Sequence, residues 1–309
     1  MRVVFMGTPD FAIPILEALI HSGHDIVGVV TQPDRPVGRK QVLTPPPIKV
    51  LAEQHQIPVF QPESIRKDYQ PIIDWRPDLI ITCAYGQIIP KILLDLPPLG
   101  AINVHASLLP KYRGGAPIQW AIINGEKETG ITLMYMSEKM DAGDIIAQSK
   151  IPIEPTDNYG TLHDKLSRLG AELLMEILPQ IEAGTNDRIP QDESLATYAW
   201  NIKKEDERIV WDKDAQAVVN QIRGLSPVPG AYTCLGEERF KIYEARVMDS
   251  TKTAVPGTIV DMVPQGLVVA CGKGQILIIE GQLAGRKRQP MENVLRGNHP
   301  FAIGKTFES

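Results

Sequence analysis

Apolar residues in this chain recur with two different spacings. In the first part, short buried runs at 2–6, 26–31, 79–84 and 101–104 alternate with segments that can form helices, such as 11–22 and 48–54. Such alternation is typical of a mostly parallel sheet covered by helices. Two more strands are expected at 129–136 and 145–153, and leucines at 162, 166, 169 and 173 predict an amphipathic helix over 159–183. We therefore expect a Rossmann-like α/β domain first.

The pattern changes after residue 183. The stretch 184–206 is polar and irregular, which is typical of a connection between domains. After a short helix near 215–222, apolar runs at 240–245, 257–263, 267–270 and 275–280 alternate with glycine-containing turns. This spacing predicts a small OB-like β-barrel. The expected organisation is a first domain over residues 1–189, a linker over 190–206 and a barrel domain over 207–309.

Composition restricts the class of protein. Hydrophobic residues make up 43% of the 309 residues and charged residues 22%, which is ordinary for a globular chain. No apolar run approaches the roughly 20 residues that span a bilayer. Because Gly7, Pro9 and Asp10 interrupt the first apolar run, we expect no secretion signal. Cys83, Cys234 and Cys271 lack metal-ligand spacing. We expect a cytoplasmic protein without a membrane segment or a metal.

The segment 35–49 (RPVGRKQVLTPPPIK) has four basic residues, no acidic residue and three consecutive prolines. Because proline restricts the backbone, we expect a semi-rigid exposed loop without regular secondary structure. The chain as a whole has a formal net charge of −5, which argues against nucleic-acid binding by bulk charge. Residues 1–205 carry 19 basic and 25 acidic groups (−6), whereas residues 206–309 carry 13 and 12 (+1).

The candidate chemistry begins at Asn103 and His105, where a predicted central strand ends. Ligands bind at such strand ends in open α/β sheets, and alternation would turn both side chains to one side. An amide donates without titrating, and an imidazole can move a proton near neutral pH, so the pair suits acyl transfer. By spacing alone, however, Asn103 could cap a turn and His105 could be a buried structural histidine.

A second polar cluster, 138–144 (EKMDAGD), lies between the last two predicted strands of the first domain. Gly143 permits a tight backbone path there. Its carboxylates could assist a neighbouring histidine, or they could be solvated residues of a hairpin. The residues alone leave both interpretations open.

A family resemblance distinguishes these interpretations. The sequence reads Asn-Val-His-Ala-Ser-Leu-Leu-Pro over 103–110, continues Tyr-Arg-Gly-Gly-Ala-Pro over 112–117, and has Met-Asp-Ala-Gly-Asp over 140–144. It closely resembles the folate-dependent formyltransferases, whose catalytic trio of Asn, His and Asp matches Asn103, His105 and Asp141. The resemblance implies 10-formyltetrahydrofolate as formyl donor, without a metal. It also implies folate contacts from Ser107, Leu108, Leu109 and Pro110, and from Tyr85, Gly86, Gln87, Ile88 and Ile89.

Two features outside this core concern the acceptor amine. The segment 38–49 is similar to the basic insertion loop of the family members that act on methionyl initiator tRNA, and 222–231 (IRGLSPVPGA) resembles the entrance to their barrel. The resemblance therefore runs nearly end to end. It implies binding of methionyl initiator tRNA by a monomer, and the expected phosphate contacts come from Arg39, Lys40, Lys49, Arg286, Lys287 and Arg288.

Three alternatives accompany this interpretation. One is a formyltransferase for an aminosugar nucleotide, and another is a non-catalytic RNA-binding protein. The third, a nucleotide-binding oxidoreductase, is disfavoured because the first turn, 7–12 (GTPDFA), lacks Gly-x-Gly-x-x-Gly. Pro9 and Asp10 would place a ring and an anion where a pyrophosphate needs backbone amides.

Overall fold

The computed structural model describes residues 1–309, which form two compact units. The first unit comprises 1–115, 128–152 and 163–199, and the second comprises 116–127, 153–162 and 200–309. The chain therefore enters the second unit twice before its C-terminal third. The predicted linker 190–206 is divided, because 190–199 belong to the first unit. The boundaries 1–189, 190–206 and 207–309 remain a prediction about domains.

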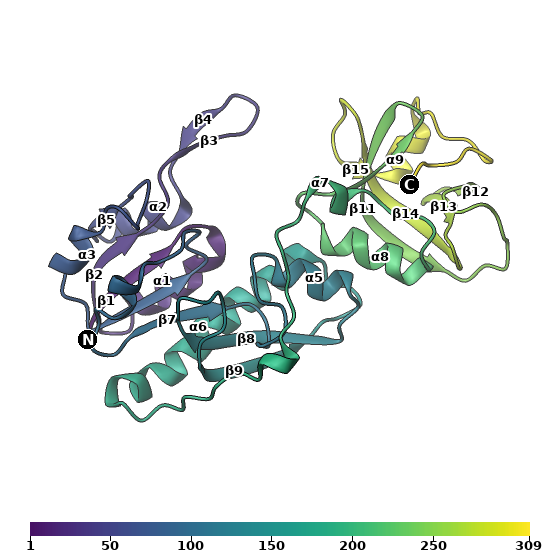
Figure 1. Ribbon diagram of the computed structural model, residues 1–309. Coiled ribbons are helices and arrows are strands. Elements are labelled where there is room, and N and C mark those ends of the chain that lie inside the picture. The colour runs from purple at the N-terminus through teal and green to yellow at the C-terminus, as the bar shows by residue number, and fades with distance from the viewer. The chain divides into compact units, whose positions relative to one another are not determined.

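The first unit is built on one seven-stranded sheet with the order β5-β2-β1-β6-β7-β8-β9 (Figure 1). All neighbouring strands are parallel except that β8 is antiparallel to both β7 and β9. The mostly parallel sheet predicted from the apolar runs is confirmed. Its strands are β1 (Arg2–Gly7), β2 (Asp25–Val30), β5 (Val59–Phe60), β6 (Leu79–Cys83), β7 (Ala101–His105), β8 (Glu128–Tyr135) and β9 (Ile145–Pro152).

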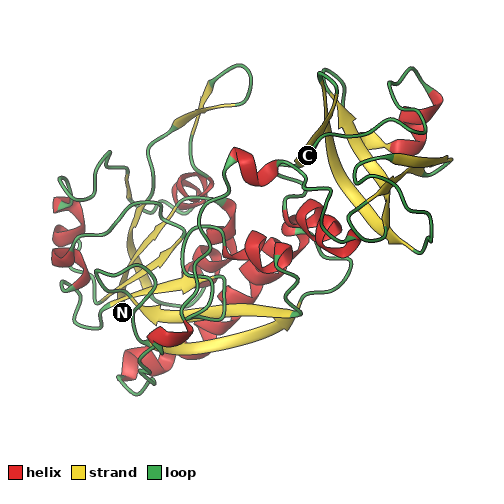
Figure 2. Ribbon diagram, turned by 45° about the vertical axis from the view of Figure 1, so that its right-hand side comes forward, coloured by secondary structure: helices red, strands yellow, loops and turns green.

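Helices pack against this sheet, as Figure 2 shows. They are α1 (Ile13–Ile20), α2 (Pro47–Gln54), α3 (Gln70–Asp74), α4 (Lys91–Leu94) and α6 (Tyr159–Ala183), with single 3₁₀ turns at η1 (Asp10–Ala12) and η2 (Glu193–Leu195). The leucine stripe predicted α6 correctly. Gly170 lets α6 approach the sheet closely, because a Cβ there would lie 3.1 Å from Val104. Val104 therefore faces α6, whereas Ala101 belongs to a core cluster that includes Val4 and Ile80.

The segment 35–49 differs from its prediction. It contains two short antiparallel strands, β3 (Arg35–Val37) and β4 (Val42–Thr44), and helix α2 begins at Pro47. The hairpin projects from its unit in Figure 1. The expectation of no regular structure was wrong because the three prolines follow the hairpin rather than interrupt it. The last proline occupies the first turn of α2, where its missing N–H costs no hydrogen bond.

The second unit contains a curved antiparallel sheet with the order β10-β11-β14-β13-β12, and β15 pairs with β14. Its strands are β10 (Ala231–Leu235), β11 (Glu238–Met248), β12 (Ile259–Val263), β13 (Gly266–Ala270), β14 (Gln275–Leu283) and β15 (Gln289–Pro290). The C-terminal tail joins the two edges: Phe307 N–H donates to Gly257 O, and Glu308 N–H donates to Cys234 O. The predicted antiparallel barrel domain is confirmed in this form.

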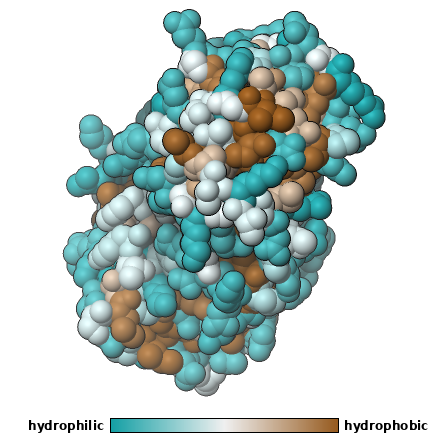
Figure 3. All heavy atoms as spheres, turned by 90° about the vertical axis from the view of Figure 1, so that its right-hand side faces the viewer, coloured by the Kyte–Doolittle hydropathy of each residue, from teal (hydrophilic) through white to brown (hydrophobic).

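Helices α5 (Pro117–Ile123), α7 (Lys204–Glu207), α8 (Ala215–Gly224) and α9 (Met291–Arg296) complete the second unit. Its core contains the fully buried Trp211, which stacks on Phe307 with ring centroids 5.6 Å apart. Trp211 Nε1–H donates to Thr233 Oγ1 at 3.0 Å, so the buried indole is satisfied. On the face shown in Figure 3, hydrophilic residues surround smaller groups of hydrophobic ones.

Candidate active site

Strand β7 carries the two polar residues at the centre of the candidate site. Asn103 lies beside Thr82 of β6 and Met134 of β8, and His105 lies beside Thr132 of β8. Side chains alternate along a strand, so both residues share a face with Ala101, opposite Val104. His105 is the last residue of β7 and lies at the carboxyl end of the parallel strands, where open α/β sheets bind ligands. The structure brings the predicted pair together.

Thr82 fixes the amide of Asn103. The Thr82 hydroxyl donates to Asn103 Oδ1 at 2.7 Å, a shorter contact than its 3.3 Å approach to Ile102 O. Because the amide oxygen accepts this bond, the Asn103 N–H₂ group is the part of the side chain that can donate to a ligand. Thr82 is 2% exposed, so the bond is shielded from water. Nothing in the sequence distinguishes Thr82, since a buried threonine in a strand has no characteristic pattern.

His105 is buried, and each of its ring nitrogens has one polar neighbour. Its Nε2 lies 2.9 Å from the carbonyl oxygen of Tyr112, and its Nδ1 lies 3.8 Å from Asp141 Oδ1. A carbonyl oxygen can only accept, so the proton of the neutral ring is on Nε2. Nδ1 then presents a lone pair on the side of Asp141. In the imidazolium form, Nδ1–H also becomes a donor, facing a carboxylate.

Asp141 lies in the loop between β8 and β9 and is mostly buried, with a side chain 14% exposed. Its Oδ2 accepts the Gly114 N–H at 2.8 Å, and its backbone adopts a left-handed φ of +52°. Gly143 is required beside it, because any side chain at 143 would overlap the carbonyl oxygen of Tyr135. Asp144, the other carboxylate of the same turn, pairs with Arg188 instead, at 2.8 Å. Only Asp141 therefore faces His105.

The segment predicted to lie along the folate, 107–110, is anchored by strands β8 and β9. Thr132 Oγ1 donates to Ser107 O at 2.7 Å, and Gln148 Nε2 donates to Leu109 O at 2.9 Å. Ser107 and Leu109 are buried, and the Ser107 hydroxyl donates to Lys111 O. The side chains of Ser107 and Leu109 therefore shape the segment from within. Leu108 and Pro110, which are half-buried, remain its accessible side chains.

The second predicted folate segment, 85–89, also contains both buried and accessible side chains. Tyr85 and Ile89 are buried, and burial raises the pKa of the Tyr85 phenol. The side chain of Gln87 is also committed, since its Oε1 accepts the Ile65 N–H at 2.8 Å. Ile88, in contrast, is 74% exposed. An exposed apolar side chain beside the left-handed Gly86 (φ +100°) fits a flat heterocycle that needs an apolar face and backbone contacts.

The basic residues predicted to bind tRNA differ in their surroundings. Arg39 and Lys40 lie exposed at the tip of the β3–β4 hairpin. Lys49 pairs with Asp34 at 3.1 Å, and Gln61 and Lys49 together lower the pKa of that carboxyl group. The charge of Lys49 is therefore largely balanced by Asp34 within the protein.

The second basic group lies between β14 and α9. Arg286 donates to Asn298 O at 2.6 Å. Arg288 pairs with Glu280 at 2.7 Å and stacks over the ring of Tyr243 at 4.2 Å. Lys287 is exposed. Within this group, Lys287 is thus the most readily available cation for a phosphate.

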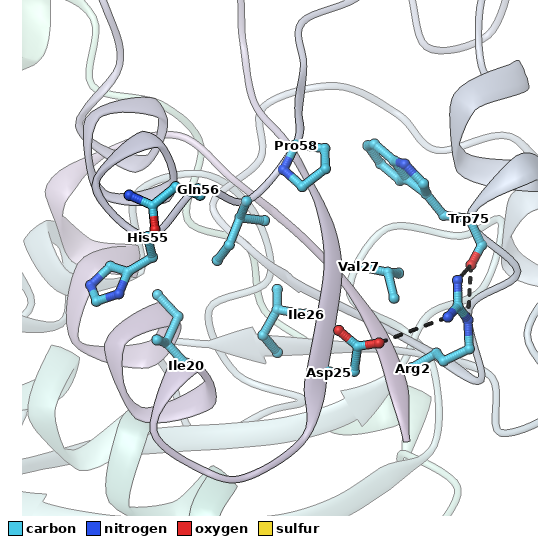
Figure 4. A pocket seen from close by; sticks show the side chains of 10 residues that line it. Arg2, Ile20, Asp25, Ile26, Val27, His55, Gln56, Pro58 and Trp75 are labelled. Carbon is cyan, nitrogen blue, oxygen red and sulfur yellow. Dashed lines mark hydrogen bonds and ion pairs between the residues drawn. The ribbon is translucent and has the colours of Figure 1, made fainter.

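A cavity of about 570 Å³ lies at the amino ends of β1 and β2 (Figure 4). Arg2 and Asp25 lie within 3.8 Å of each other there, and Trp75 borders the same cavity. Because β1, β6 and β7 are parallel, this cavity is at the opposite edge of the sheet from His105. It is separate from the candidate active site.

Comparison with known proteins identifies the family of this chain. Residues 1–178 match the formyl transferase family, and residues 201–299 match the formyl transferase C-terminal domain. The chain thus has the two-part organisation of that class of enzyme. Methionyl-tRNA formyltransferases of Staphylococcus aureus strains RF122 and N315 are 53% identical to it over 307 residues, covering 98% of this chain and 98% of theirs. The chain belongs to the methionyl-tRNA formyltransferase family.

Solved structures share the fold at lower identity. HypX from Aquifex aeolicus, in complex with tetrahydrofolic acid, superposes with a TM-score of 0.65 at 19% identity, covering 96% of this chain and 47% of HypX. The chain therefore spans about half the length of HypX. WlaRD, a sugar 3N-formyl transferase, gives a TM-score of 0.67 at 18% identity, covering 93% of this chain and 99% of WlaRD.

Proposed function

We propose that Asn103, His105 and Asp141 are the catalytic group with which this chain transfers the formyl group of 10-formyltetrahydrofolate to the amino group of methionyl initiator tRNA. The observation that carries the proposal is their convergence at the carboxyl end of β7: Asn103 presents its N–H₂ group, and His105 Nδ1 lies 3.8 Å from Asp141. Family membership supports the activity, and the donor rests on the family resemblance and on the tetrahydrofolic acid bound to the similar HypX.

The reaction forms one C–N bond and breaks another. Attack of the amine on the formyl carbon gives a tetrahedral intermediate with an oxyanion, and collapse releases the folate nitrogen. Asn103 stabilises the oxyanion through its N–H₂ group, because Thr82 already occupies its amide oxygen. A preorganised donor of this kind typically lowers the barrier by roughly 3 kcal/mol.

Proton transfer falls to His105 and Asp141. The amine loses a proton as the new C–N bond forms, and the departing folate nitrogen gains one. Neutral His105 accepts the proton at Nδ1, since Nε2–H is bound to Tyr112 O. Asp141 stabilises the resulting imidazolium, whose Nδ1–H then donates to the oxyanion or protonates the leaving nitrogen. His105 can therefore assist the oxyanion only after it has accepted the proton.

The folate is proposed to lie between the segments 107–110 and 85–89. The accessible side chains Leu108, Pro110 and Ile88 provide its apolar contacts, while Ser107, Leu109, Tyr85, Gln87 and Ile89 hold the two segments in shape. Gly86 has a left-handed φ of +100°, and a Cβ there would lie 2.9 Å from Gln32 Nε2. We expect a cytoplasmic location, since the acceptor belongs to translation initiation, and a monomer, as the family resemblance implies. No helix of the structure has the length and apolar character needed to cross a bilayer.

The acceptor and the residues are tested in turn. Purified protein is incubated with 10-formyltetrahydrofolate and methionyl initiator tRNA, and formylmethionyl-tRNA is quantified beside aminosugar nucleotides as alternative acceptors. Formylation of the tRNA alone is expected. Formyl transfer only to a sugar would support that alternative, and tRNA binding without transfer by folded protein would indicate an RNA-binding module.

His105→Ala and Asp141→Asn are expected to fold and to bind tRNA but to lose at least about 100-fold in kcat, because each removes a group that acts on the reacting atoms. The exposed His21→Ala and Asp68→Asn provide matched controls with normal turnover. Single-turnover formylation rates and melting temperatures give the measurement. Near-normal kcat in either active-site variant would contradict the role assigned to that residue.

A further inference from the structure

The residues 189–199, which we call the strap, hold together the two loops that carry the active site. The strap begins beside β9, where Ile189 and Ile145 exchange two backbone hydrogen bonds of 2.9 and 2.7 Å. It ends beside the loop that follows β7, where Arg113 N–H donates to Thr197 O at 2.9 Å and Ala199 N–H donates to Arg113 O at 2.6 Å. The sequence predicted part of a linker here, and the structure instead shows a segment fixed at both ends.

Gln191 lies near the start of the strap and reaches the backbone of Asp141. Its Nε2 donates to Asp141 O and to Gly143 O, both at 2.8 Å. Its Oε1 accepts from Arg113 Nη2 at 2.9 Å and from Nε at 3.3 Å. Both N–H donors and the oxygen of the amide are therefore used. A side chain so fully bonded has one defined orientation.

Arg113 gives Gln191 that orientation. Its guanidinium is fully buried and forms a two-pronged pair with the Glu193 carboxylate, both contacts at 2.9 Å. A buried cation is stable only with such partners, so Arg113 cannot move without exposing an uncompensated charge. Held in this way, Arg113 directs its remaining N–H groups at Gln191 Oε1, which turns the Gln191 N–H₂ group toward the Asp141 loop.

Asp141 requires support of this kind. Its left-handed backbone is less favourable for a residue with a Cβ, and Oδ1 must keep its position 3.8 Å from His105 Nδ1 while Oδ2 accepts Gly114 N–H. The side chain of Gln191 supplies a donor to the Asp141 carbonyl oxygen. Fixing the carbonyls on both sides of Ala142 fixes the turn that sets the direction of the Asp141 side chain.

We infer that Gln191 is a positioning residue for formyl transfer, which acts by clamping the backbone of Asp141 and Gly143. The inference rests on the proposed catalytic role of Asp141. The amide of Gln191 is bonded to protein atoms on both sides, so its loss is expected to lower kcat and to leave the KM for methionyl-tRNA unchanged. Misplacement of a catalytic group by about 1 Å can cost on the order of 100-fold, and we expect a loss of about 10- to 100-fold.

Gln191→Glu separates this role from support of Arg113. The substituted carboxylate keeps the acceptor for Arg113 but has no N–H to donate to the two carbonyl oxygens. We expect a reduced kcat and, because two carbonyl oxygens lose their donor, a lower melting temperature, whereas a residue that only stabilises Arg113 would give normal kcat. Gln180→Glu, an exposed change of the same chemistry on α6, is the control. Gln191→Leu, which removes both functions, should lower kcat and stability together.

A double-variant cycle tests whether Gln191 acts through Asp141. If it does, Gln191→Glu combined with Asp141→Asn is no slower than Asp141→Asn alone, because the aspartate's contribution is already lost. Additive losses in the double variant would overturn the inference. Normal kcat in Gln191→Glu, together with an inactive Asp141→Asn, would also overturn it but would leave the proposed function intact. Normal turnover in Asp141→Asn would remove the proposed function and this inference together.

Discussion

At the scale of single residues, the site is set by hydrogen bonds that fix which atom of each side chain is available. Thr82 occupies the amide oxygen of Asn103, and Tyr112 O binds Nε2 of His105. These bonds leave the Asn103 N–H₂ group and the His105 Nδ1 atom available to a ligand. The residue types at 103, 105 and 141 were predictable from the family resemblance. Their supports were not, because a threonine hydroxyl and a backbone carbonyl become partners only through strand register and loop folding.

Thr82→Val tests the support of Asn103. Valine keeps the shape of threonine but leaves Asn103 Oδ1 without its 2.7 Å donor, so the amide can rotate away from the oxyanion. We expect kcat to fall about tenfold, less than the roughly 100-fold or greater loss from removing a donor outright. Urea unfolding should show a loss of about 1–3 kcal/mol from the unsatisfied acceptor. The exposed Thr251→Val serves as control, and unchanged kcat would show that Asn103 needs no such support.

At the scale of elements, the strap is the clearest departure from expectation. Its sequence lacks apolar periodicity, which is why it was assigned to a linker, yet its polar side chains bind inward. Glu193 lies at the outer end of this hydrogen-bond network, and its carboxylate accepts hydrogen bonds from both Arg113 and Lys139 at 2.9 Å. The β3–β4 hairpin was not predicted either, because strands of three residues are too short for the alternation of apolar and polar residues to be recognised.

Glu193 makes the strap sensitive to acid. Hydrogen bonds from Arg113, and then from Lys139, lower the pKa of Glu193 from its usual 4.5 to about 2. The folded state thus favours the ionised carboxylate, so its stabilisation is complete above pH 4.5 and is lost as the pH falls through about 2. We expect the difference in unfolding free energy between wild type and Glu193→Gln to shrink over this range in urea titrations. The exposed Glu53→Gln is the control variant, and a pH-independent difference for Glu193→Gln would contradict the assignment.

At the scale of the whole molecule, charge is unevenly distributed. The chain is acidic overall, with a net charge of −5, but the tip of the β3–β4 hairpin presents Arg39 and Lys40 without acidic neighbours in its sequence. The barrel unit has cations of its own, although Arg286 and Arg288 also serve internal contacts. Local clusters of this kind are sufficient for phosphate contacts in an acidic protein.

Salt dependence tests the hairpin contacts. Affinity for methionyl-tRNA should fall as salt rises, because each phosphate contact releases counterions. Arg39→Ala combined with Lys40→Ala should flatten the slope of log affinity against log salt by about one for each lost contact. Arg66→Ala with Lys67→Ala, another exposed basic pair, is the matched control. Filter-binding titrations give the slope, and an unchanged slope in the hairpin variant would exclude these two residues from the tRNA interface.

The sequence by itself determined the layers of this protein and the identity of its central residues. Apolar runs and the leucine stripe of α6 fixed the α/β unit, and the glycine-containing alternation after residue 230 fixed the antiparallel unit, because burial imposes periods that a single chain displays. Motif context then selected Asn103, His105 and Asp141.

The tertiary structure alone decided what holds those residues in place. Contacts between Gln191 and Asp141 or between Thr82 and Asn103 join positions 50 and 21 residues apart. The tertiary structure also places the strap in the first unit, pairs Lys49 with Asp34, and closes the barrel with the C-terminal tail. Hydrogen bonds and ion pairs depend on direction and distance in space. The periodicity of apolar residues indicates only whether a residue is buried, so it does not predict these bonds.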